Sequence, residues 1–518
     1  MRNTCRYWLP IFLLGFATVT LNAQSFRVQC PTSTITHPAA SNNSEPAYTS
    51  ATAVNGAIKC QQISGGDGYS TMGDGTQTYM FSFGPLSGLA DIANGLPGTE
   101  FPTVFNTPYA GAQPLQPGDP ATTGLGTFTY NGAIGQVPDV DAQAAGLCGG
   151  SGQPSCIDGH VDPRQIMDVG VMNGNIPAPL MAIDEDDEFF LTLTNVGMIM
   201  RPDLFEQHTV HFHGYPNASA FYDGVPDASV AINIGGSFTY YYLAPDAGTY
   251  FWHCHITPPE HLQMGMVGQI YVRPRQNRVP VGTTLYSALQ TQQLNLRTAC
   301  NPAADILCTN PLPAGGSTGN TVTRAATGNY AYNDGDGSTY YDVEYPIQIH
   351  GFDPNFHFVG MTFNPEGFTD MKDKYFLLNG RSYPDTVTPG PMQTESVDGS
   401  NHFSQPLPSI INITHGQKAL LRISDLDVTE YQTLASLGIP MKVIGYNAKL
   451  LRDQAGNNLY YTTNSITLGG GESLDVILDA SDPQYAAGQV FYLYTPNLDH
   501  LANDAENFGG LMTEVHIN

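Results

Sequence analysis

The chain has 518 residues and a formal net charge of −27 at pH 7, with 19 Lys and Arg against 46 Asp and Glu. This balance argues against a nucleic-acid partner, because phosphate binding needs clustered cationic side chains. Gly and Pro are abundant, at 55 and 38 residues, and only 13% of the residues are charged. With no long helical periodicity, this composition predicts an all-β protein rich in loops.

The first residues have the features of a secretory signal peptide. Two arginines precede an apolar run from Trp8 to Val19, and small residues follow as far as Ala23. The run is shorter than the roughly 20 residues that a membrane-spanning helix needs, and no later stretch is long and apolar enough to span. We therefore expect residues 1–23 to be removed by cleavage after Ala23, which makes the protein secreted or periplasmic.

Six of the remaining cysteines lie in Gly-, Pro- and Ser-rich segments, as disulfide cysteines of an exported protein do. Cys5 leaves with the signal peptide, and Cys254 is left over between two histidines. The favoured pairs join sequence neighbours: Cys30 with Cys60, Cys148 with Cys156, and Cys300 with Cys308.

Residues 24–165 form a loop-rich segment that is either part of the first domain or an insertion. The run ISGGDGYSTMGDGTQ, from Ile63 to Gln77, is typical of turns rather than of a sheet. Short strand candidates, Gln77–Phe83 and Gly126–Tyr130, interrupt the segment.

From residue 166 the chain shows alternating or aromatic-rich runs separated by turn residues, which predict Greek-key sandwiches. We expect a first sandwich over 166–275, a connector over 276–342 and a second sandwich over 343–518. The stretch GTYFWHCHITPPEHLQMGMVGQIYV at 248–272 has a coarse echo in GQVFYLYTPNLDHLANDAENFGGLMTEVHI at 488–517. This echo indicates two copies of one sandwich, the second without metal ligands.

Six of the 14 histidines fall between residues 208 and 261, in the runs HTVHFHG and HCH and at His261. Neighbouring residues of a strand point to opposite faces. Cys254 is therefore expected to point away from His253 and His255, while His211 and His213 share one face. One strand would serve two sites, with a thiolate in one and imidazoles in the other.

A thiolate, two imidazoles and a weak thioether are the ligands of a blue (type 1) copper site. His208, Cys254, His261 and Met266 offer these four groups, and Met264 competes with Met266 for the axial place. A lone buried Cys is more often a small hydrophobe, but this one has matching imidazoles nearby in the sequence.

The runs HTVHFHG and YFWHCHITPPEHLQMGM resemble the copper signature of the multicopper oxidases, the laccase and ascorbate-oxidase superfamily, and the likeness extends over about 170–518. The resemblance implies tandem cupredoxin β-sandwiches with long loop insertions, and copper as the cofactor. It makes His253, Cys254 and His255 the electron path of the catalytic centre. The implied ligands are His208, Cys254, His261 and Met266 for type 1 copper, His211 for type 2, and His213, His253 and His255 for type 3 copper.

The chain departs from the family pattern in its second half. A three-copper cluster takes twice as many imidazoles as the four that this chain offers in family order. The later histidines have no HxH spacing: His350, His357, His402, His415, His500 and His516. A partner subunit or a second copy of the chain would complete the cluster, or the four histidines form a smaller copper site.

Three functions remain open at this point. The favoured one is an exported copper-dependent oxidoreductase that oxidises a reductant at the type 1 copper and passes electrons to a His-ligated copper site and on to O2. The second is a blue-copper electron carrier or copper-binding protein without oxidase activity. The third, a copper nitrite reductase, needs an Asp in place of His211 and a second-domain histidine that the sequence does not show.

The expected reductant is a small molecule such as a phenol, a metal ion, or a redox protein. Electrons are expected to reach the type 1 copper at His261, as the exposed edge of the site. The acidic run Asp184–Glu188 is expected to be the solvated start of a strand, although it could attract cations. His37 and His160 fit no motif.

Overall fold

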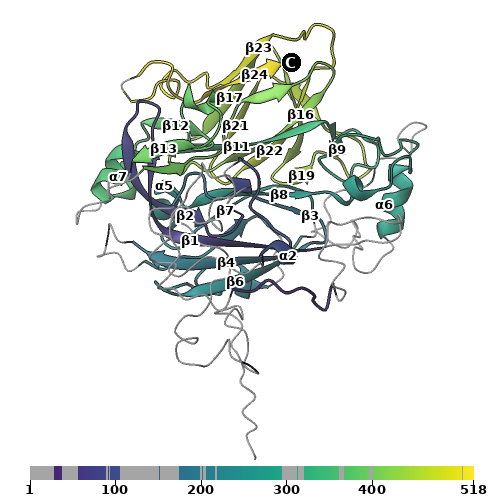
Figure 1. Ribbon diagram of the computed structural model, residues 1–518. Coiled ribbons are helices and arrows are strands. Elements are labelled where there is room, and N and C mark those ends of the chain that lie inside the picture. The colour runs from purple at the N-terminus through teal and green to yellow at the C-terminus, as the bar shows by residue number, and fades with distance from the viewer. Residues whose placement is uncertain are drawn as a thin grey trace, which may run out of the picture.

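The structure is a computed structural model that describes residues 28–37, 57–88, 91–92, 94–105, 151, 174–198, 201, 206–215, 219–244, 246–293, 312, 320–360, 367–395, 401–504 and 506–518. Two β-sandwiches lie one above the other (Figure 1), which confirms the predicted all-β fold of tandem cupredoxin domains. None of the helices in these ranges is both long and apolar enough to cross a membrane. The signal peptide, Gly126–Tyr130, His160 and the predicted pairs Cys148–Cys156 and Cys300–Cys308 lie outside these ranges.

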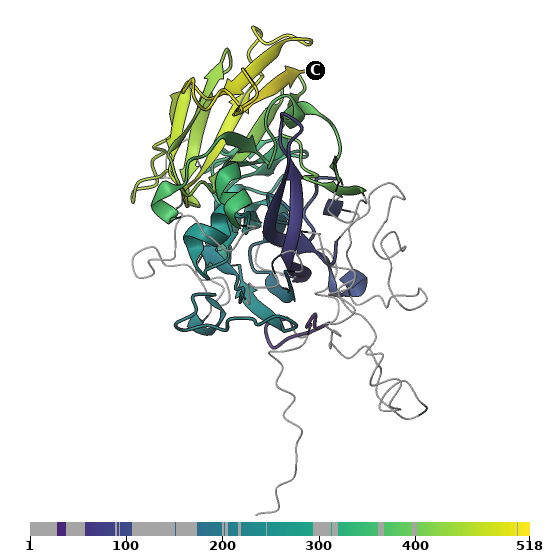
Figure 2. The same cartoon turned by 90° about the vertical axis from the view of Figure 1, so that its left-hand side faces the viewer.

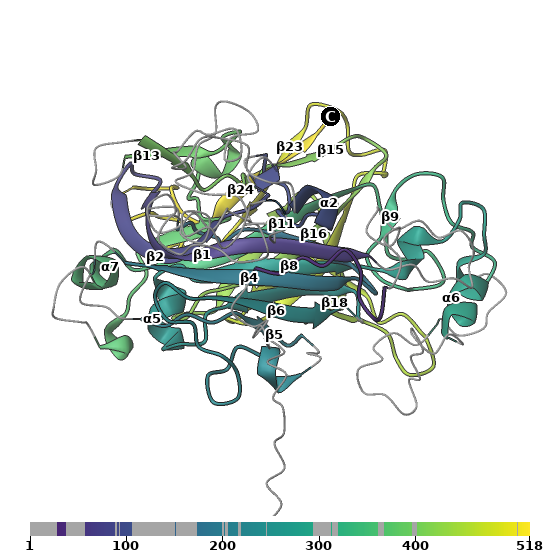
Figure 3. The same ribbon diagram turned by 60° about the horizontal axis from the view of Figure 1, so that its bottom comes forward.

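The first sandwich consists of two four-stranded sheets, with the strand orders β2-β1-β4-β6 and β3-β8-β7-β5. Figure 3 shows β1, β2 and β4 lying side by side across the molecule. The two sheets enclose an apolar core that includes Trp252 and the Cys254 side chain. The strands are β1 (Ile58–Thr71), β2 (Gln77–Pro85), β3 (Met181–Asp184), β4 (Glu188–Gly197), β5 (His211–His213), β6 (Ser237–Leu243), β7 (Gly248–His253) and β8 (Val267–Arg273).

The glycine-rich run after Ile58 is a long strand, so the expectation of turns over residues 63–77 is wrong for its first part. β1 pairs parallel to β4 and antiparallel to β2, and it places residues 58–85 in the first sandwich. Its glycines mark close packing: a Cβ at Gly66 would lie 2.6 Å from Val196 Cγ2. Glycine inside a strand often marks such a close approach, which its composition alone does not distinguish from a turn.

The predicted disulfide between Cys30 and Cys60 is present and fastens residues 28–37 to β1. The tip of the β1–β2 hairpin reaches the second sandwich, where the Gln405 side chain accepts a bond from Thr71 N (2.9 Å) and donates one to Thr71 O (3.0 Å). In Figure 2 this hairpin rises from the first sandwich toward the second. The N-terminal part of the chain therefore links the two domains.

The second sandwich repeats the strand order of the first. Its sheets are β12-β11-β16-β22-β18-β19, with β20 beside β18, and β15-β24-β23-β17-β21. The parallel pairs β1/β4 and β3/β8 correspond to β11/β16 and β15/β24. The strands are β11 (Val343–Phe352), β12 (Tyr375–Leu378), β15 (Ile411–Ile413), β16 (Lys418–Asp425), β17 (Gln432–Leu437), β18 (Met441–Tyr446), β19 (Lys449–Leu450), β20 (Tyr461–Thr463), β21 (Ser465–Leu468), β22 (Ser473–Asp479), β23 (Val490–Tyr494) and β24 (Met512–Ile517).

Short helices and two small hairpins lie between these strands. The helix α5 belongs to the loop between β7 and β8, and the two-stranded sheet β9–β10 lies between the sandwiches in sequence. These elements are α2 (Pro102–Phe105), α5 (Pro258–Gln263), α6 (Leu285–Gln293), α7 (Pro354–Gly360), β9 (Asn329–Tyr330), β10 (Tyr340–Tyr341), β13 (Met392–Glu395), β14 (Asn401–Ser404), and the 3-10 turns η3 (Ala220–Tyr222), η4 (Arg275–Arg278), η5 (Phe368–Asp370) and η6 (Asp385–Val387).

The acidic run before β4 is neutralised rather than solvated, so that expectation is wrong. Asp187 is fully buried and lies 3.3 Å from Lys59 Nζ, and Asp186 accepts bonds from Arg275 and Arg278. A buried carboxylate needs such partners, because its desolvation is costly. The run is therefore part of the first domain's framework.

A buried ion cluster joins the two sandwiches. Glu344 of β11 accepts bonds from Arg273 of β8 (2.6 Å) and from Arg422 of β16 (2.9 Å). Nearby, the Thr249 hydroxyl of β7 donates to Asp475 of β22 (2.6 Å). Burial raises the pKa of Glu344, but the two guanidinium groups outweigh it and lower the pKa to about 2. The packing of β7 and β8 on the second sandwich thus depends on paired buried charges.

We predict that Glu344→Gln lowers the free energy of unfolding at pH 7 by about 3 kcal/mol, because it leaves the buried Arg422 and the partly exposed Arg273 without their shared carboxylate. A folded-state pKa below the unfolded value means that this stabilisation is complete above the unfolded pKa and disappears as the pH falls through about 2. Chemical denaturation from pH 7 to pH 2 should show the wild-type advantage shrinking. The exposed pair Lys418–Asp479 provides the control, since Asp479→Asn should cost less than about 1 kcal/mol. An equal cost of the two substitutions would contradict the prediction.

Candidate metal centre

Four side chains with sulfur and imidazole donors meet inside the first sandwich. Cys254 directly follows β7, His208 precedes β5, His261 lies on α5 and Met266 precedes β8. All four are fully buried. One donor atom from each of His208, Cys254 and His261 lies within 4.8 Å of the other two. The chain folds this way because Cys254 N donates to Met266 O (3.1 Å) and Met266 N donates to His261 O (2.9 Å), which closes the loop.

The donors of this group fit a metal ion. His261 Nδ1 lies 3.2 Å from Cys254 Sγ, and Thr209 N–H points at the sulfur from 3.4 Å. Both ring nitrogens of His208 are buried without a hydrogen-bond partner among the residues that the structure describes. Buried polar nitrogens are rarely left unpaired, so a ligand is the simplest partner for them. A soft thiolate with two imidazoles is the donor set that copper prefers.

The thioether of Met266 lies on the same side of the group. A Cβ placed on Gly65 of β1 would lie 2.7 Å from His208 Cδ2 and 3.4 Å from Met266 Cε, so both side chains pack on this glycine. Met264 is buried as well, and Met266 is the methionine that shares the contact at Gly65 with His208. The packing favours Met266 as the axial group.

The thiol is prepared to ionise. Burial alone would raise the pKa of Cys254, but His261 and His208 outweigh that effect and hold the pKa well below its usual range. Burial lowers the pKa of His261, whereas the neighbouring thiolate raises it, to about 9. Burial also lowers the pKa of His208. Thiolate and neutral imidazole are the forms that bind metals, so a metal bound here would displace the proton that His261 holds.

His261 is buried rather than exposed, so the expectation that it forms the surface edge of the site is wrong. Phe81 of β2 packs edge-on against its ring, with the centroids 5.2 Å apart. Glu206 lies at 3.8 Å from its Nε2, and the Glu206 side chain is 28% exposed. The imidazole is therefore shielded, and its neighbouring carboxylate is partly exposed.

The remaining four imidazoles form a second group on the other side of the strand. The ring of His211 lies 6.0, 5.3 and 5.2 Å from the rings of His213, His253 and His255. His211 Nδ1 contacts the carbonyl of Asp223 (2.7 Å), and His253 Nδ1 contacts the carbonyl of Cys254 (2.7 Å). Such contacts fix the ring and leave the other nitrogen for a metal.

Three of these imidazoles are held neutral. Burial lowers the pKa values of His211 and His213, and it lowers that of His253 to about 3. Donor atoms of these three lie within 4.8 Å of one another, while His255 is a ring neighbour of His211 and His253 outside that tighter set. The arrangement can hold at least one metal ion through neutral nitrogens.

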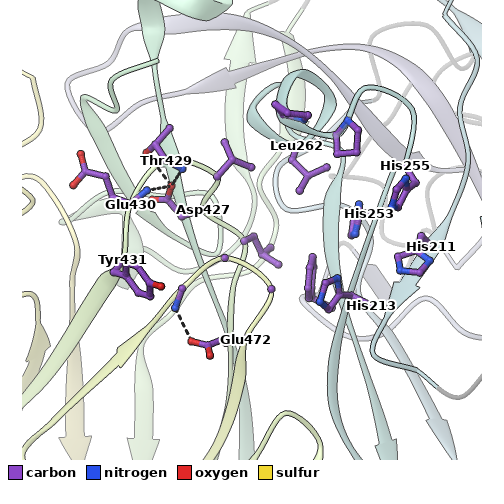
Figure 4. A pocket seen from close by; sticks show the side chains of 18 residues that line it. His211, His213, His253, His255, Leu262, Asp427, Thr429, Glu430, Tyr431 and Glu472 are labelled. Carbon is purple, nitrogen blue, oxygen red and sulfur yellow. Dashed lines mark hydrogen bonds between the residues drawn. The ribbon is translucent and has the colours of Figure 1, made fainter. Parts of the chain in front are cut away.

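The four imidazoles line a cavity of about 670 Å³ between the two sandwiches (Figure 4). Its opposite wall comes from two loops of the second sandwich, residues 426–431 and 469–472. The carboxylates of this wall are already engaged: Asp427 accepts from Thr429 N (2.7 Å) and Gln432 Nε2 (2.6 Å), and Glu472 accepts from Gly469 N (2.8 Å). In Figure 4 the Glu430 and Glu472 side chains extend away from the imidazoles.

The later histidines whose side chains the structure describes do not reach this cavity. His350, His357 and His500 are buried elsewhere in or beside the second sandwich, and neither these three nor His415 and His516 line the cavity. The His402 side chain lies outside the described residues. The second sandwich therefore contributes a wall to the cavity and, over the part of the chain that the structure describes, no imidazole.

Sequence reasoning missed several contributors to the site. Gly65 lies in a run that is typical of turns, and Glu206 lies two residues before the HTVHFHG run but is not part of its pattern. Asp223 acts through its carbonyl and through its carboxylate, which lies 3.5 Å from His211 Nδ1, and the sequence alone showed neither contact. The loops of the second sandwich became visible only through the packing of the two domains.

A family model described as "Multicopper oxidase" matches residues 158–277, the segment that contains both ligand groups. Residues 158–277 thus carry a domain of the multicopper oxidase cupredoxin superfamily. The multicopper oxidase MCE of Talaromyces pinophilus is 34% identical over 122 residues, and a copper-containing nitrite reductase of Rhizobium meliloti is 35% identical over 109 residues. The match to the multicopper oxidase covers 23% of this chain and 19% of the relative, and the match to the nitrite reductase covers 20% of this chain and 26% of the relative.

The chain thus spans about a fifth to a quarter of the length of these curated relatives. A solved structure, the blue copper oxidase from Nitrosomonas europaea, is 21% identical to this chain, with a TM-score of 0.43. It covers 67% of this chain and 78% of its own. Copper is the metal that this superfamily binds, and the two His and Cys groups described above are its candidate ligands.

We predict that Gly65→Ala disturbs the thiolate group without touching a donor atom. The new methyl would overlap His208, so copper-loaded protein should show a shifted or weakened visible thiolate band, and the free energy of unfolding should fall by about 1–3 kcal/mol. Absorption spectra and chemical denaturation test this. Ser64→Ala on the neighbouring residue is the control, and an unchanged spectrum of Gly65→Ala would contradict the contact.

Proposed function

We propose that the protein is an exported, copper-dependent oxidoreductase of the multicopper oxidase type. His208, Cys254, His261 and Met266 would hold a type 1 copper that accepts electrons from a reductant. His211, His213, His253 and His255 would hold a second copper site, which would deliver the electrons to O2. Copper, when bound, supplies the one-electron redox chemistry of both sites.

One observation carries this proposal: consecutive residues of the chain belong to the two different ligand groups. Cys254 belongs to the thiolate group, while His253 belongs to the imidazole group and contacts the Cys254 carbonyl through Nδ1 (2.7 Å). His255 N donates a hydrogen bond to the Thr209 hydroxyl oxygen (2.9 Å), and this bond holds His255 in position. A path of covalent bonds and one short hydrogen bond thus joins the groups. An electron carrier alone would not need the second group.

The first group is arranged for electrons that arrive from outside the protein. Burial of all four side chains excludes water and keeps the surroundings of the site fixed when its charge changes. The partly exposed Glu206 carboxylate lies between His261 and the surface. With a net charge of −27, the protein would attract cationic reductants more than anionic ones.

The second group needs further ligands for a complete three-copper cluster. Among the residues that the structure describes, the wall formed by the second sandwich supplies no imidazole, so we propose that a partner subunit or a second copy of the chain brings imidazoles to the cavity. A second copy would have to present its own four-histidine face, because the described part of its second sandwich places no imidazole on the corresponding wall.

Nitrite reduction is less well supported, although a nitrite reductase is among the relatives. Position 211 carries an imidazole instead of the carboxylic acid that such an enzyme needs, and no second-sandwich histidine lines the described cavity wall. Nitrite reduction therefore remains an alternative for which the described residues of this chain lack two functional groups, the carboxylic acid and the second-sandwich histidine.

We predict that copper-loaded wild-type protein consumes O2 and binds more than one copper per chain, and that Cys254→Ser abolishes the visible thiolate band. Oxidase activity should fall by more than about 100-fold, since even loss of an outer-shell partner costs roughly 10–100-fold. His213→Ala should keep the thiolate band, lose copper from the second site and lose O2 consumption. His415→Ala, at an exposed histidine, is the matched control. A single copper per chain without O2 consumption would refute the oxidase and leave an electron carrier.

The route through Glu206 gives a separate prediction. Glu206→Gln should lower kcat/KM for a cationic reductant such as Fe(II) several-fold at low salt, and should leave an anionic reductant unchanged or faster. Steady-state kinetics at two ionic strengths measure the difference. An equal effect on both reductants would place the path of the electron elsewhere.

A further inference from the structure

The second sandwich contains a polar cluster at the position that the thiolate group occupies in the first. His500 Nδ1 contacts Gln432 Oε1 (2.9 Å), and His500 Nε2 contacts Glu430 Oε2 (2.8 Å). Gln432 and His500 are 1% and 2% exposed. No motif of the sequence assigns a role to this cluster.

The strands that carry this cluster pair in the same register as the corresponding strands of the first sandwich. His211 pairs with His253 and His213 with Phe251, just as Ala435 pairs with Tyr494 and Leu437 with Tyr492. His208 and Gln432 each precede a glycine with positive φ by six residues, Gly214 and Gly438. This register makes Gln432 the counterpart of His208.

A second strand confirms the same register. His208 forms a bridge with Ile232, and Gln432 pairs with Leu468. The next strand begins five residues later in both domains, at Ser237 and at Ser473.

The loop after the central strand matches as well. Cys254 N donates to Met266 O (3.1 Å) and Met266 N donates to His261 O (2.9 Å). In the second sandwich, Thr495 N donates to Leu511 O (3.0 Å) and Leu511 N donates to His500 O (3.0 Å). Thr495, His500 and Leu511 therefore stand where Cys254, His261 and Met266 stand in the first sandwich.

The surroundings of the two imidazoles agree too. His261 packs on Phe81 of β2, and His500 stacks on Phe376 of β12, the equivalent strand (centroids 4.0 Å apart). Glu206, two residues before His208, approaches His261 Nε2, and Glu430, two residues before Gln432, contacts His500 Nε2. In both domains Nδ1 points inward and Nε2 points to a carboxylate.

We propose that Gln432, Thr495, His500 and Leu511 form a latent type 1 copper site, in which one imidazole ligand is retained and hydrogen bonds replace the metal. Gln432 fixes the cluster, since its amide donates to Asp427 Oδ2 (2.6 Å) and its oxygen faces His500 Nδ1. All four positions are at most 2% exposed, so the pocket already excludes water as a type 1 site does. This inference depends on the geometry of the second sandwich alone and does not require the proposed oxidase activity.

The test restores the ligands in a chain whose first site cannot give a thiolate band. In full-length Cys254→Ser protein, the added substitutions Gln432→His, Thr495→Cys and Leu511→Met should yield one additional copper per chain, with a thiolate-to-copper visible band and the paramagnetic resonance signal of a type 1 site. The matched control carries Thr495→Ser in place of Thr495→Cys and should stay colourless. Circular dichroism and thermal unfolding establish that both proteins are folded.

A smaller change guards against failure to fold. Because the axial ligand of such a site is weak, Gln432→His with Thr495→Cys should give the band with Leu511 left in place. A folded triple or double variant that binds no additional copper, or binds it without the thiolate band, would overturn the proposal.

Discussion

The alternation of side chains along a single extended segment is the constraint on which the rest of the site depends. Because neighbouring residues of a strand point to opposite faces, Cys254 enters the sandwich core while His253 and His255 leave it. The thiolate group must then be completed from inside the domain, by His208, His261 and Met266. The imidazole group must be completed by residues from outside the first sandwich. The packing of the second sandwich therefore decides how much space is left in front of the four rings.

The sequence predicted the features that depend on residue type and spacing. The all-β fold, the Cys30–Cys60 disulfide and the copper-binding superfamily followed from composition, cysteine neighbours and the HxxHxH and HCH runs. Three expectations failed because they depend on what packs nearby. Gly65 and its neighbours form a central strand, Asp187 is buried against Lys59, and His261 is covered by Phe81. A sequence does not show which distant side chain covers a residue.

The two sandwiches show how one framework accepts different interiors. Backbone hydrogen bonds around Cys254, His261 and Met266 recur around Thr495, His500 and Leu511 with nearly equal lengths. The loop geometry is therefore a property of the fold rather than of a bound metal. Whether such a domain has a metal site therefore depends on which side chains the same backbone carries.

The glycines of the loop at 469–471 set the distance between the two domains. A Cβ on Gly471 would lie 3.2 Å from His213 Nε2, so the second sandwich approaches the imidazole group as closely as a bare backbone allows. The loop takes up little of the space in front of the four rings, and a chamber of about 670 Å³ remains. The second sandwich, whose described residues place no imidazole on this wall, thus limits the size of the molecule that can reach the four histidines of the first sandwich.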